Sequence, residues 1–109
     1  MSARYIVFPK ADRDLDDIAD YLVEEADLET GLRFLTLSDQ TFVLLATQPE
    51  MGWKSRLKHP ALASMRVFRV SGFEKIMIFY EPRDECIAIV RVLHGSRDLE
   101  ALFEKEGLR

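Results

Sequence analysis

The sequence contains little cysteine, histidine and glycine, and each shortage excludes a class of protein. Its one cysteine, Cys86, cannot form an internal disulfide, which favours a reducing, cytoplasmic environment. The two histidines, His59 and His94, show no metal-ligand spacing with Cys86, so neither a metal site nor a cofactor is expected. The five glycines are scattered and form no phosphate-binding loop, which excludes dinucleotide chemistry.

Long apolar runs are also absent. No segment approaches the roughly 20 apolar residues that a membrane helix needs, and Tyr5–Phe8 is too short for a signal-peptide core. With 109 residues, of which 48% are hydrophobic and 31% charged, the chain has the composition of one globular domain, residues 1–109. We therefore expect a cytoplasmic protein that has no membrane partner.

Charge is unevenly distributed along the chain. Residues 1–50 contain eleven acidic and four basic side chains, a net charge of −7, whereas residues 51–109 contain eleven basic and eight acidic ones, a net charge of +3. The total of −4, with an isoelectric point near 5.2, argues against broad nucleic-acid binding, and direct sequence-specific binding is not expected either. The second half can still present a local basic patch.

Hydrophobic periodicity predicts two helices followed by three strands. Apolar residues recur at three- and four-residue steps in the helical segments, whereas β-branched and aromatic runs separated by short turns indicate antiparallel strands. The predicted elements are a strand at 4–8, helices at 11–26 and 29–47, strands at 65–70, 75–80 and 86–93, and a C-terminal helix at 98–105. This order, β-α-α-β-β-β-α, predicts an α+β fold in which a helical hairpin packs on a curved, mainly antiparallel four-stranded sheet.

The second predicted helix is apolar around most of its circumference. At about 100° per residue, two apolar stripes lie on roughly opposite sides, and the polar wedge is narrow. One stripe contains Leu28, Leu32, Leu35, Phe42 and Ala46, and the other contains Phe34, Leu37, Leu44 and Leu45. Either the helix lies between the first helix and the sheet, which is the favoured interpretation, or one stripe is a surface for a partner chain.

The last two predicted strands carry apolar side chains on both faces. A strand with one face in water alternates instead, but Ile76–Tyr80 and Ile87–Val90 do not. The helical hairpin can cover one face of the sheet. The C-terminal helix or a protein partner covers the other, and the sequence leaves both alternatives open.

Basic residues gather on the strands and in a connector at 53–60. Arg66 and Arg69 lie on opposite faces of their strand because they are an odd number of positions apart. His94 follows the last strand within a turn of Arg97, and a histidine flanked by arginines can move a proton and stabilise an anionic phosphorane during RNA cleavage. The favoured alternative is that His94 and Arg97 organise the turn after the strand.

Segments along nearly the whole chain resemble a known family. The run from Arg91 to Asp98 (Arg-Val-Leu-His-Gly-Ser-Arg-Asp) is the most specific of them. This run lies within residues 87–99. Together with residues 79–80, that segment is similar to the C-terminal signature of ParE-type toxins in the RelE/ParE superfamily of type II toxin–antitoxin systems. Upstream, residues 14–22 resemble this family's first helix, and residues 34–45 with 49–52 resemble its second helix and the turn after it. Residues 66–70 with 72–73 resemble its first sheet hairpin.

The resemblance implies a bacterial toxin, active in growth inhibition and plasmid stabilisation, that a cognate antitoxin neutralises by direct binding in a hetero-oligomer. In this family the C-terminal segment of the antitoxin covers the toxin, which fits a chain with apolar surface on both sides of its sheet and helix. The expected antitoxin contacts are Leu37, Leu44, Ile78, Tyr80, Ile89 and His94. This prediction depends on apolar area that the monomer leaves exposed.

Two targets divide the superfamily. ParE-like members inhibit DNA gyrase and replication by protein–protein binding, whereas RelE-like members are basic, ribosome-dependent mRNA endonucleases with a tyrosine near the C-terminal end. The acidic isoelectric point and the lack of any tyrosine after Tyr80 favour gyrase, so no catalytic residue is expected. The alternatives are a ribonuclease that uses His94, Arg97 and Arg91, or a non-toxic relative that only binds its antitoxin. The residues that contact the target are not predicted.

Overall fold

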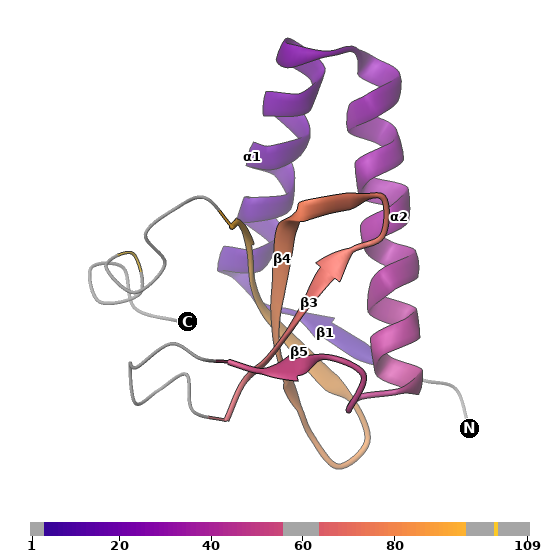
Figure 1. Ribbon diagram of the computed structural model, residues 1–109, viewed down its shortest axis with the longest axis vertical. Helices are drawn as coiled ribbons and strands as arrows, with labels where there is room; N and C mark the ends of the chain where they lie inside the picture. Colours follow the sequence, from indigo (N-terminus) through magenta and orange to yellow (C-terminus); the bar gives the residue numbers. More distant parts are fainter. Residues whose placement is uncertain (1–3, 56–63, 96–101, 103–109) are drawn as a thin grey trace.

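The computed structural model describes residues 4–55 and 64–95 together with Leu102. Two helices form one layer, and a five-stranded sheet forms the other (Figure 1). The elements follow one another in the order β1-α1-α2-β2-β3-β4-β5, which confirms the predicted α+β class. Within the described residues, neither helix is both long and apolar enough to span a bilayer.

The two helices are α1, Pro9–Glu25, and α2, Leu28–Thr47. Helix α1 begins at Pro9 rather than at the predicted Ala11, because proline at the first helical position gives up no hydrogen bond. Asp27 caps α2, since its Oδ1 accepts hydrogen bonds from the backbone N of Thr30 at 2.8 Å and from Thr30 Oγ1 at 2.7 Å. These hydrogen bonds hold the pKa of Asp27 below its usual value.

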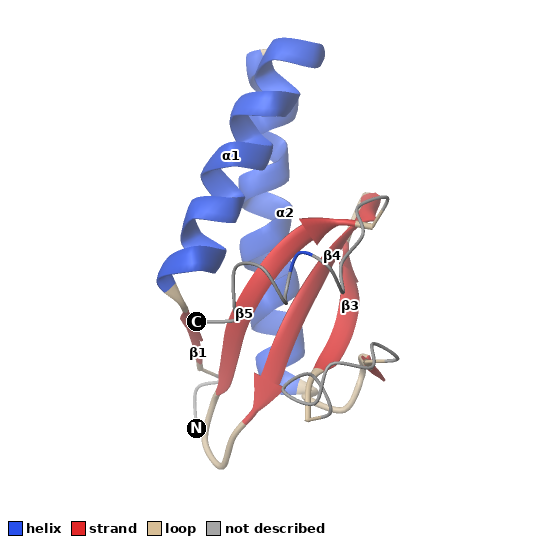
Figure 2. Ribbon diagram, turned by 90° about the vertical axis from the view of Figure 1, so that its left-hand side faces the viewer, coloured by secondary structure: helices blue, strands red, loops and turns tan. Residues whose placement is uncertain are grey.

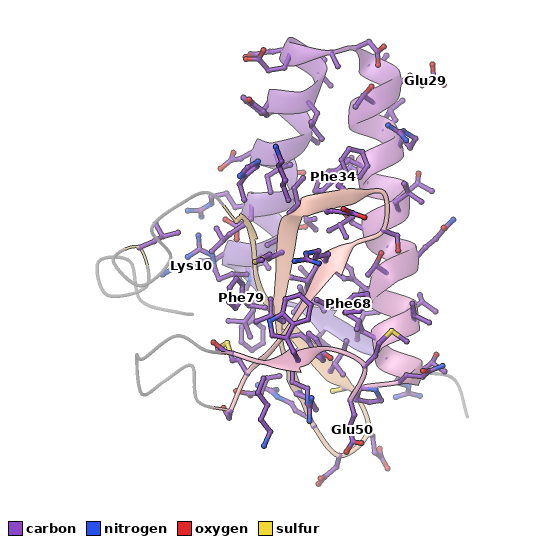
Figure 3. The ribbon with its side chains drawn as sticks, viewed as in Figure 1. Lys10, Glu29, Phe34, Glu50, Phe68 and Phe79 are labelled. Carbon is purple, nitrogen blue, oxygen red and sulfur yellow. The ribbon has the colours of Figure 1, made fainter. Side chains whose placement is uncertain are left out.

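The helices run antiparallel and approach closely near their connector (Figure 1). A Cβ atom at Gly31 of α2 would lie 3.0 Å from the carbonyl oxygen of Ala19 and 2.5 Å from Cγ2 of Val23, both on α1. Glycine at position 31 therefore sets the spacing of the hairpin. Farther along α2, Phe34 is fully buried and points toward the sheet, where its ring meets Phe73 edge-on at 5.4 Å (Figure 3).

The sheet has the strand order β1-β5-β4-β3-β2 and is curved (Figure 2). Its strands are β1, Tyr5–Val7; β2, Trp53–Lys54; β3, Arg66–Val70; β4, Phe73–Pro82; and β5, Ile87–His94. Strand β1 pairs with β5 in parallel and all other pairs are antiparallel. The prediction of four strands was one short, because β2 lies in the predicted connector and two residues are too few to show a periodicity.

Strand β5 contains a bulge that changes which of its residues face the helices. Phe79 of β4 is opposite Arg91 and the next residue, Tyr80, is opposite Ile89, so Val90 is left over between the two pairs. Before this extra residue the odd-numbered residues of β5 face the helices, and after it the even-numbered residue Val92 does. Ile89 therefore packs toward the helices, whereas Val90 packs on the opposite face.

Both faces of the sheet are buried within the chain. The core between helices and sheet includes Phe34, Leu45, Ile78, Tyr80 and Ile89, among others. On the opposite face, a second core is formed by Met65, Val67, Phe79, Val90 and Leu93, none of them more than 4% exposed.

Leu102 packs against this second core, so part of the predicted C-terminal helix segment reaches the face that the sequence left open to a partner. The other residues of 98–105 lie outside the described residues. The buried residues of the central strands therefore do not supply the exposed apolar area on which the antitoxin prediction depends. Among the described residues, most exposed large apolar side chains lie on the helices, and Ile6 of β1 and Trp53 of β2 are the ones on the sheet.

Asp14 of α1 completes the hydrogen bonding of β5 where β1 ends. Strand β1 stops at Val7 and the chain turns into α1, which leaves the outer edge of β5 without a neighbouring strand beyond that point. Oδ2 of Asp14 accepts the backbone N–H of Val92 at 3.0 Å and Nε of Arg91 at 2.7 Å, while its Oδ1 accepts Nη2 of Arg91 at 3.0 Å. One carboxylate thus fixes the helix, the strand edge and a buried guanidinium together.

Tyr5 links β1 to α2. Its hydroxyl donates a hydrogen bond to the carboxylate of Asp39, and its ring lies 5.3 Å from the ring of Phe42. Burial, together with the hydrogen bond to Asp39 and the charge of that carboxylate, raises the pKa of Tyr5 from 10.0 to about 12. Deprotonation would place two negative charges side by side.

This contact predicts a loss of stability at alkaline pH. Because the pKa of Tyr5 is higher in the folded chain than in the unfolded chain, its contribution is complete below pH 10.0 and is lost as pH rises toward about 12. Tyr5→Phe should therefore flatten the fall of the urea midpoint across this range relative to wild type. Tyr21→Phe, at an exposed tyrosine, is the matched control and should keep the wild-type slope. Equal slopes for wild type and Tyr5→Phe would contradict the assignment.

Candidate protein-binding surface

Exposed large apolar side chains gather on the helical hairpin. Leu28, Leu32 and Leu35 form one row along α2, which we call the α2 stripe, and Leu28 and Leu32 are 63% and 55% exposed. On α1, Tyr21 is 57% exposed. The described residues thus leave substantial apolar area on the helices, where soluble monomers rarely expose a continuous patch without a function.

The α2 stripe is exposed because the helices extend beyond the sheet. Figures 1 and 2 both show the connector half of the hairpin standing past the end of the strands. In the other half, Phe42 continues the same row but is covered by Tyr5 of β1. The row is therefore core at one end and surface at the other. A surface for a partner chain at the exposed end stays a prediction.

Acidic side chains surround the exposed end of the hairpin. The acidic residues next to the connector are Glu24, Glu25, Asp27 and Glu29. Glu29 points into solvent at the start of α2 (Figure 3). A segment that binds here meets an apolar row with a negative border, which favours an amphipathic partner with basic flanks.

A groove opens beside the hairpin, between α1 and the start of β4. Its volume is about 620 Å³. The residues that line it are Asp17, Ile18, Tyr21, Leu22, Phe73, Glu74, Lys75, Ile76 and His94. Apolar side chains predominate, while the charged ones supply the few polar contacts that orient a bound side chain.

Three of the predicted antitoxin contacts are core residues. Ile78, Tyr80 and Ile89 are each 0% exposed in the monomer and belong to the core between helices and sheet. The sequence pattern showed that they were apolar but could not show that α1 and α2 cover them. They present no side-chain surface to a second chain in this monomer, and their expected role as antitoxin contacts stays an untested prediction.

Tyr80 instead fastens the turn that follows α2. Its hydroxyl donates to the carbonyl oxygen of Pro49 at 2.7 Å and accepts the N–H of Gly52 at 2.9 Å. Burial raises the pKa of Tyr80, although the hydrogen bond from Gly52 and the charge of Arg66 act in the opposite direction. A Cβ at Gly52 would lie 2.5 Å from the hydroxyl oxygen, so only glycine fits there.

The other three predicted contacts keep accessible surface. Leu44 is exposed on α2, and Leu37 is half-buried beside the β3–β4 turn, where a Cβ at Gly72 would lie 3.2 Å from its Cδ1. His94 is half-buried at the end of β5 and lines the groove. The structure therefore places these residues at separate parts of the hairpin and groove rather than in one cluster.

Of the residues of the ribonuclease alternative, the structure describes Arg91 and His94. Arg91 is 3% exposed and its guanidinium is held by Asp14. His94 lies in the groove, and Arg97 lies outside the described residues. Among residues 4–55 and 64–95, no group of histidine, cysteine or carboxylate side chains could hold a metal ion.

Sequence reasoning missed Tyr21, Phe73 and Asp14. Tyr21 lies at the border of the apolar face of α1. An aromatic residue among acidic ones was the sequence feature that could have indicated an exposed contact residue there. Phe73 lies between the predicted strands at 65–70 and 75–80, and it contributes to the groove because β4 begins there. The pairing of Asp14 with Arg91 joins positions 77 residues apart, and no local pattern indicates it.

Comparison with known proteins identifies the family. A family model described as the ParE toxin of type II toxin–antitoxin system, parDE, matches residues 5–99. A solved structure described as "Chromosomal ParDE TA system from P. aeruginosa" has a TM-score of 0.69 at 18% identity, over 85% of this chain and 96% of that chain, and at this identity it shows the fold alone. Comparison with curated proteins gives no match. The chain belongs to the ParE toxin family of type II toxin–antitoxin systems.

Proposed function

We propose that this chain arrests growth by binding DNA gyrase in the cytoplasm, and that a cognate antitoxin neutralises it in a hetero-oligomer. The toxin holds gyrase in its cleaved complex with DNA and catalyses no reaction itself. Membership of the ParE toxin family supplies the general activity. The observation that supports a protein partner most directly is the exposed apolar area of the α2 stripe. The groove between α1 and β4 offers a second surface.

The antitoxin is proposed to lie along the hairpin and to reach into the groove. Leu28 and Leu32 provide the largest exposed apolar area on α2, and Leu44 extends it on another side of the helix. In the groove, Tyr21 and His94 offer one aromatic and one polar contact. Burial of this area from water supplies the driving force for binding.

Two observations support a protein target over RNA cleavage. Arg91, one of the three residues that a ribonuclease would use, is buried and held by Asp14, so it cannot reach a phosphate. The net charge of −4 also opposes docking on ribosomal RNA, because binding to a polyanion depends on released counterions and basic contacts.

Expression of the chain without its antitoxin tests the proposal. DNA synthesis should stop before protein synthesis, with induction of the DNA-damage response, and co-expression of the cognate antitoxin should restore growth. Incorporation of labelled thymidine and methionine separates the two arrests, and a supercoiling assay with purified gyrase tests the target directly. Early arrest of translation with cut mRNA would instead establish the ribonuclease. Unchanged growth would identify a non-toxic relative that only binds its antitoxin.

A further inference from the structure

The outer edge of the sheet at β2 combines an exposed aromatic ring with three basic side chains. Trp53 is 37% exposed although it lies in a strand, and Lys54 beside it is also exposed. Arg66 and Arg69 come from the neighbouring strand β3. We call these four residues the β2 edge. It lies at the opposite end of the strand order from β1, away from the helical connector (Figure 1).

The three cations of the β2 edge have no carboxylate partner within the described ranges. The guanidinium of Arg69 lies 5.4 Å from the centre of the Trp53 ring, and Nη1 of Arg66 donates to the carbonyl oxygen of Gly52 at 2.7 Å. Lys54 is directly opposite Arg66 in the β2–β3 register. Like charges directly opposite each other repel, and an anion bound between Lys54 and Arg66 would reduce this repulsion.

The charges are divided between the two faces of the sheet. Trp53 is opposite Val67 on β3, and Arg69 is opposite Met77 on β4. Val67 belongs to the second core and Met77 packs against it, so Trp53 and Arg69 lie on the face of the sheet that carries this core. Lys54 and Arg66 lie on the other face, because successive side chains of a strand alternate. An occupant that meets all four residues must pass along the edge itself.

The backbone of β2 is also open toward the outside. The N–H of Ser55 donates to the carbonyl oxygen of Met65 on β3 at 3.0 Å. Because successive peptide groups of a strand point to opposite sides, the N–H and C=O of Lys54 point away from β3. No described strand pairs with β2 on that side.

We propose that the β2 edge binds an extended, acidic segment of a protein partner by strand addition. The added strand pairs with the outward backbone groups of Lys54, and its successive side chains reach opposite faces. One carboxylate meets Lys54 and Arg66, and the next meets Arg69 on the Trp53 face. A lysine on an edge strand discourages indiscriminate pairing, and it makes an acidic strand the preferred one.

A single-stranded nucleic acid fits these observations less well. Its phosphates follow one groove, whereas the cations here lie on two faces of a strand. Base stacking on Trp53 would also have to displace Arg69 from the ring. The proposal depends neither on gyrase nor on the antitoxin, and it names the chemistry of the partner segment only.

Trp53 is the single tryptophan of the chain, so its fluorescence reports this edge alone. The probe is a seven-residue peptide with three successive glutamates between valines and threonines, and the control peptide has lysines in their place. The glutamate peptide should change the fluorescence of Trp53 in a saturable, salt-sensitive way and slow hydrogen exchange at the Lys54 amide. The lysine peptide should do neither.

Charge reversal tests the residues themselves. Lys54→Glu with Arg69→Glu should weaken binding of the glutamate peptide by about tenfold or more, whereas Arg13→Glu, at an exposed arginine of α1, should leave it unchanged. Equal binding of both peptides, no saturable change up to millimolar peptide, or equal loss in the Arg13→Glu control would overturn the proposal. Tighter binding of a thymidine oligonucleotide than of the glutamate peptide would overturn it in favour of nucleic acid.

Discussion

Replacement of Asp14 by alanine is expected to lower the free energy of unfolding by about 3–5 kcal/mol, because it removes the carboxylate that accepts two hydrogen bonds from the buried guanidinium of Arg91. The same change removes the acceptor of the Val92 N–H at the unpaired edge of β5. Domains of this size are stable by only about 5–15 kcal/mol, so the variant should unfold at a much lower urea concentration.

A matched control lies on the same helix. Asp16→Ala removes an exposed carboxylate of α1 and should change stability by no more than about 0.5 kcal/mol. Equal urea midpoints for the Asp14 and Asp16 variants would contradict the role assigned to Asp14.

A double substitution separates the charge from the packing. If the cost of Asp14→Ala arises from an uncompensated buried charge, Asp14→Leu combined with Arg91→Met should recover most of the lost stability. Both replacements keep apolar volume between α1 and β5. A double variant no more stable than Asp14→Ala would show that the hydrogen bond to Val92, rather than the charge, carries the effect.

The helices and the order of the long strands follow from local patterns. Over 17 and 20 residues, the apolar period of α1 and α2 repeats often enough to distinguish helix from strand. Breakers such as Pro49 with Gly52 then mark the boundary before the sheet. These signals depend on neighbouring residues alone, and the structure confirms what they predict.

Features that depend on distant partners could not be predicted in this way. The bulge at Val90 exists because β4 and β5 pair with one residue in excess, and it shifts later residues of β5 to the other face. Strand β2 forms because Trp53 pairs with Val67, fourteen positions away. Neither feature leaves a periodic trace in the sequence.

The candidate surface was only half predictable for the same reason. The sequence showed an α2 row that is apolar along its length, but Phe42 is covered by β1 and Leu32 is not. Likewise Ile78 and Ile89 have the composition of a contact surface and yet lie in the core. Apolar character indicates burial by something, and only the arrangement of the layers shows whether the chain itself or a partner provides it.

Truncation of the α2 stripe is expected to weaken the antitoxin complex while leaving the fold intact. Leu28→Ala with Leu32→Ala removes the two most exposed side chains of the stripe, and alanine is at least as good a helix former as leucine, so the urea midpoint should not fall. If these leucines anchor the antitoxin, affinity should drop by about 2 kcal/mol or more, which is roughly 30-fold in the dissociation constant. Titration calorimetry with the purified antitoxin measures this loss.

The control and the groove variant make the result specific. Gln40→Ala replaces an exposed polar residue of the same helix outside the α2 stripe and should bind the antitoxin like wild type. Tyr21→Ala opens the groove without touching the stripe. If the Tyr21 variant loses affinity and the leucine variant does not, the groove holds the antitoxin and the stripe does not. If both variants bind normally, the exposed apolar area of the hairpin serves another partner, and the antitoxin has to bind elsewhere on the chain.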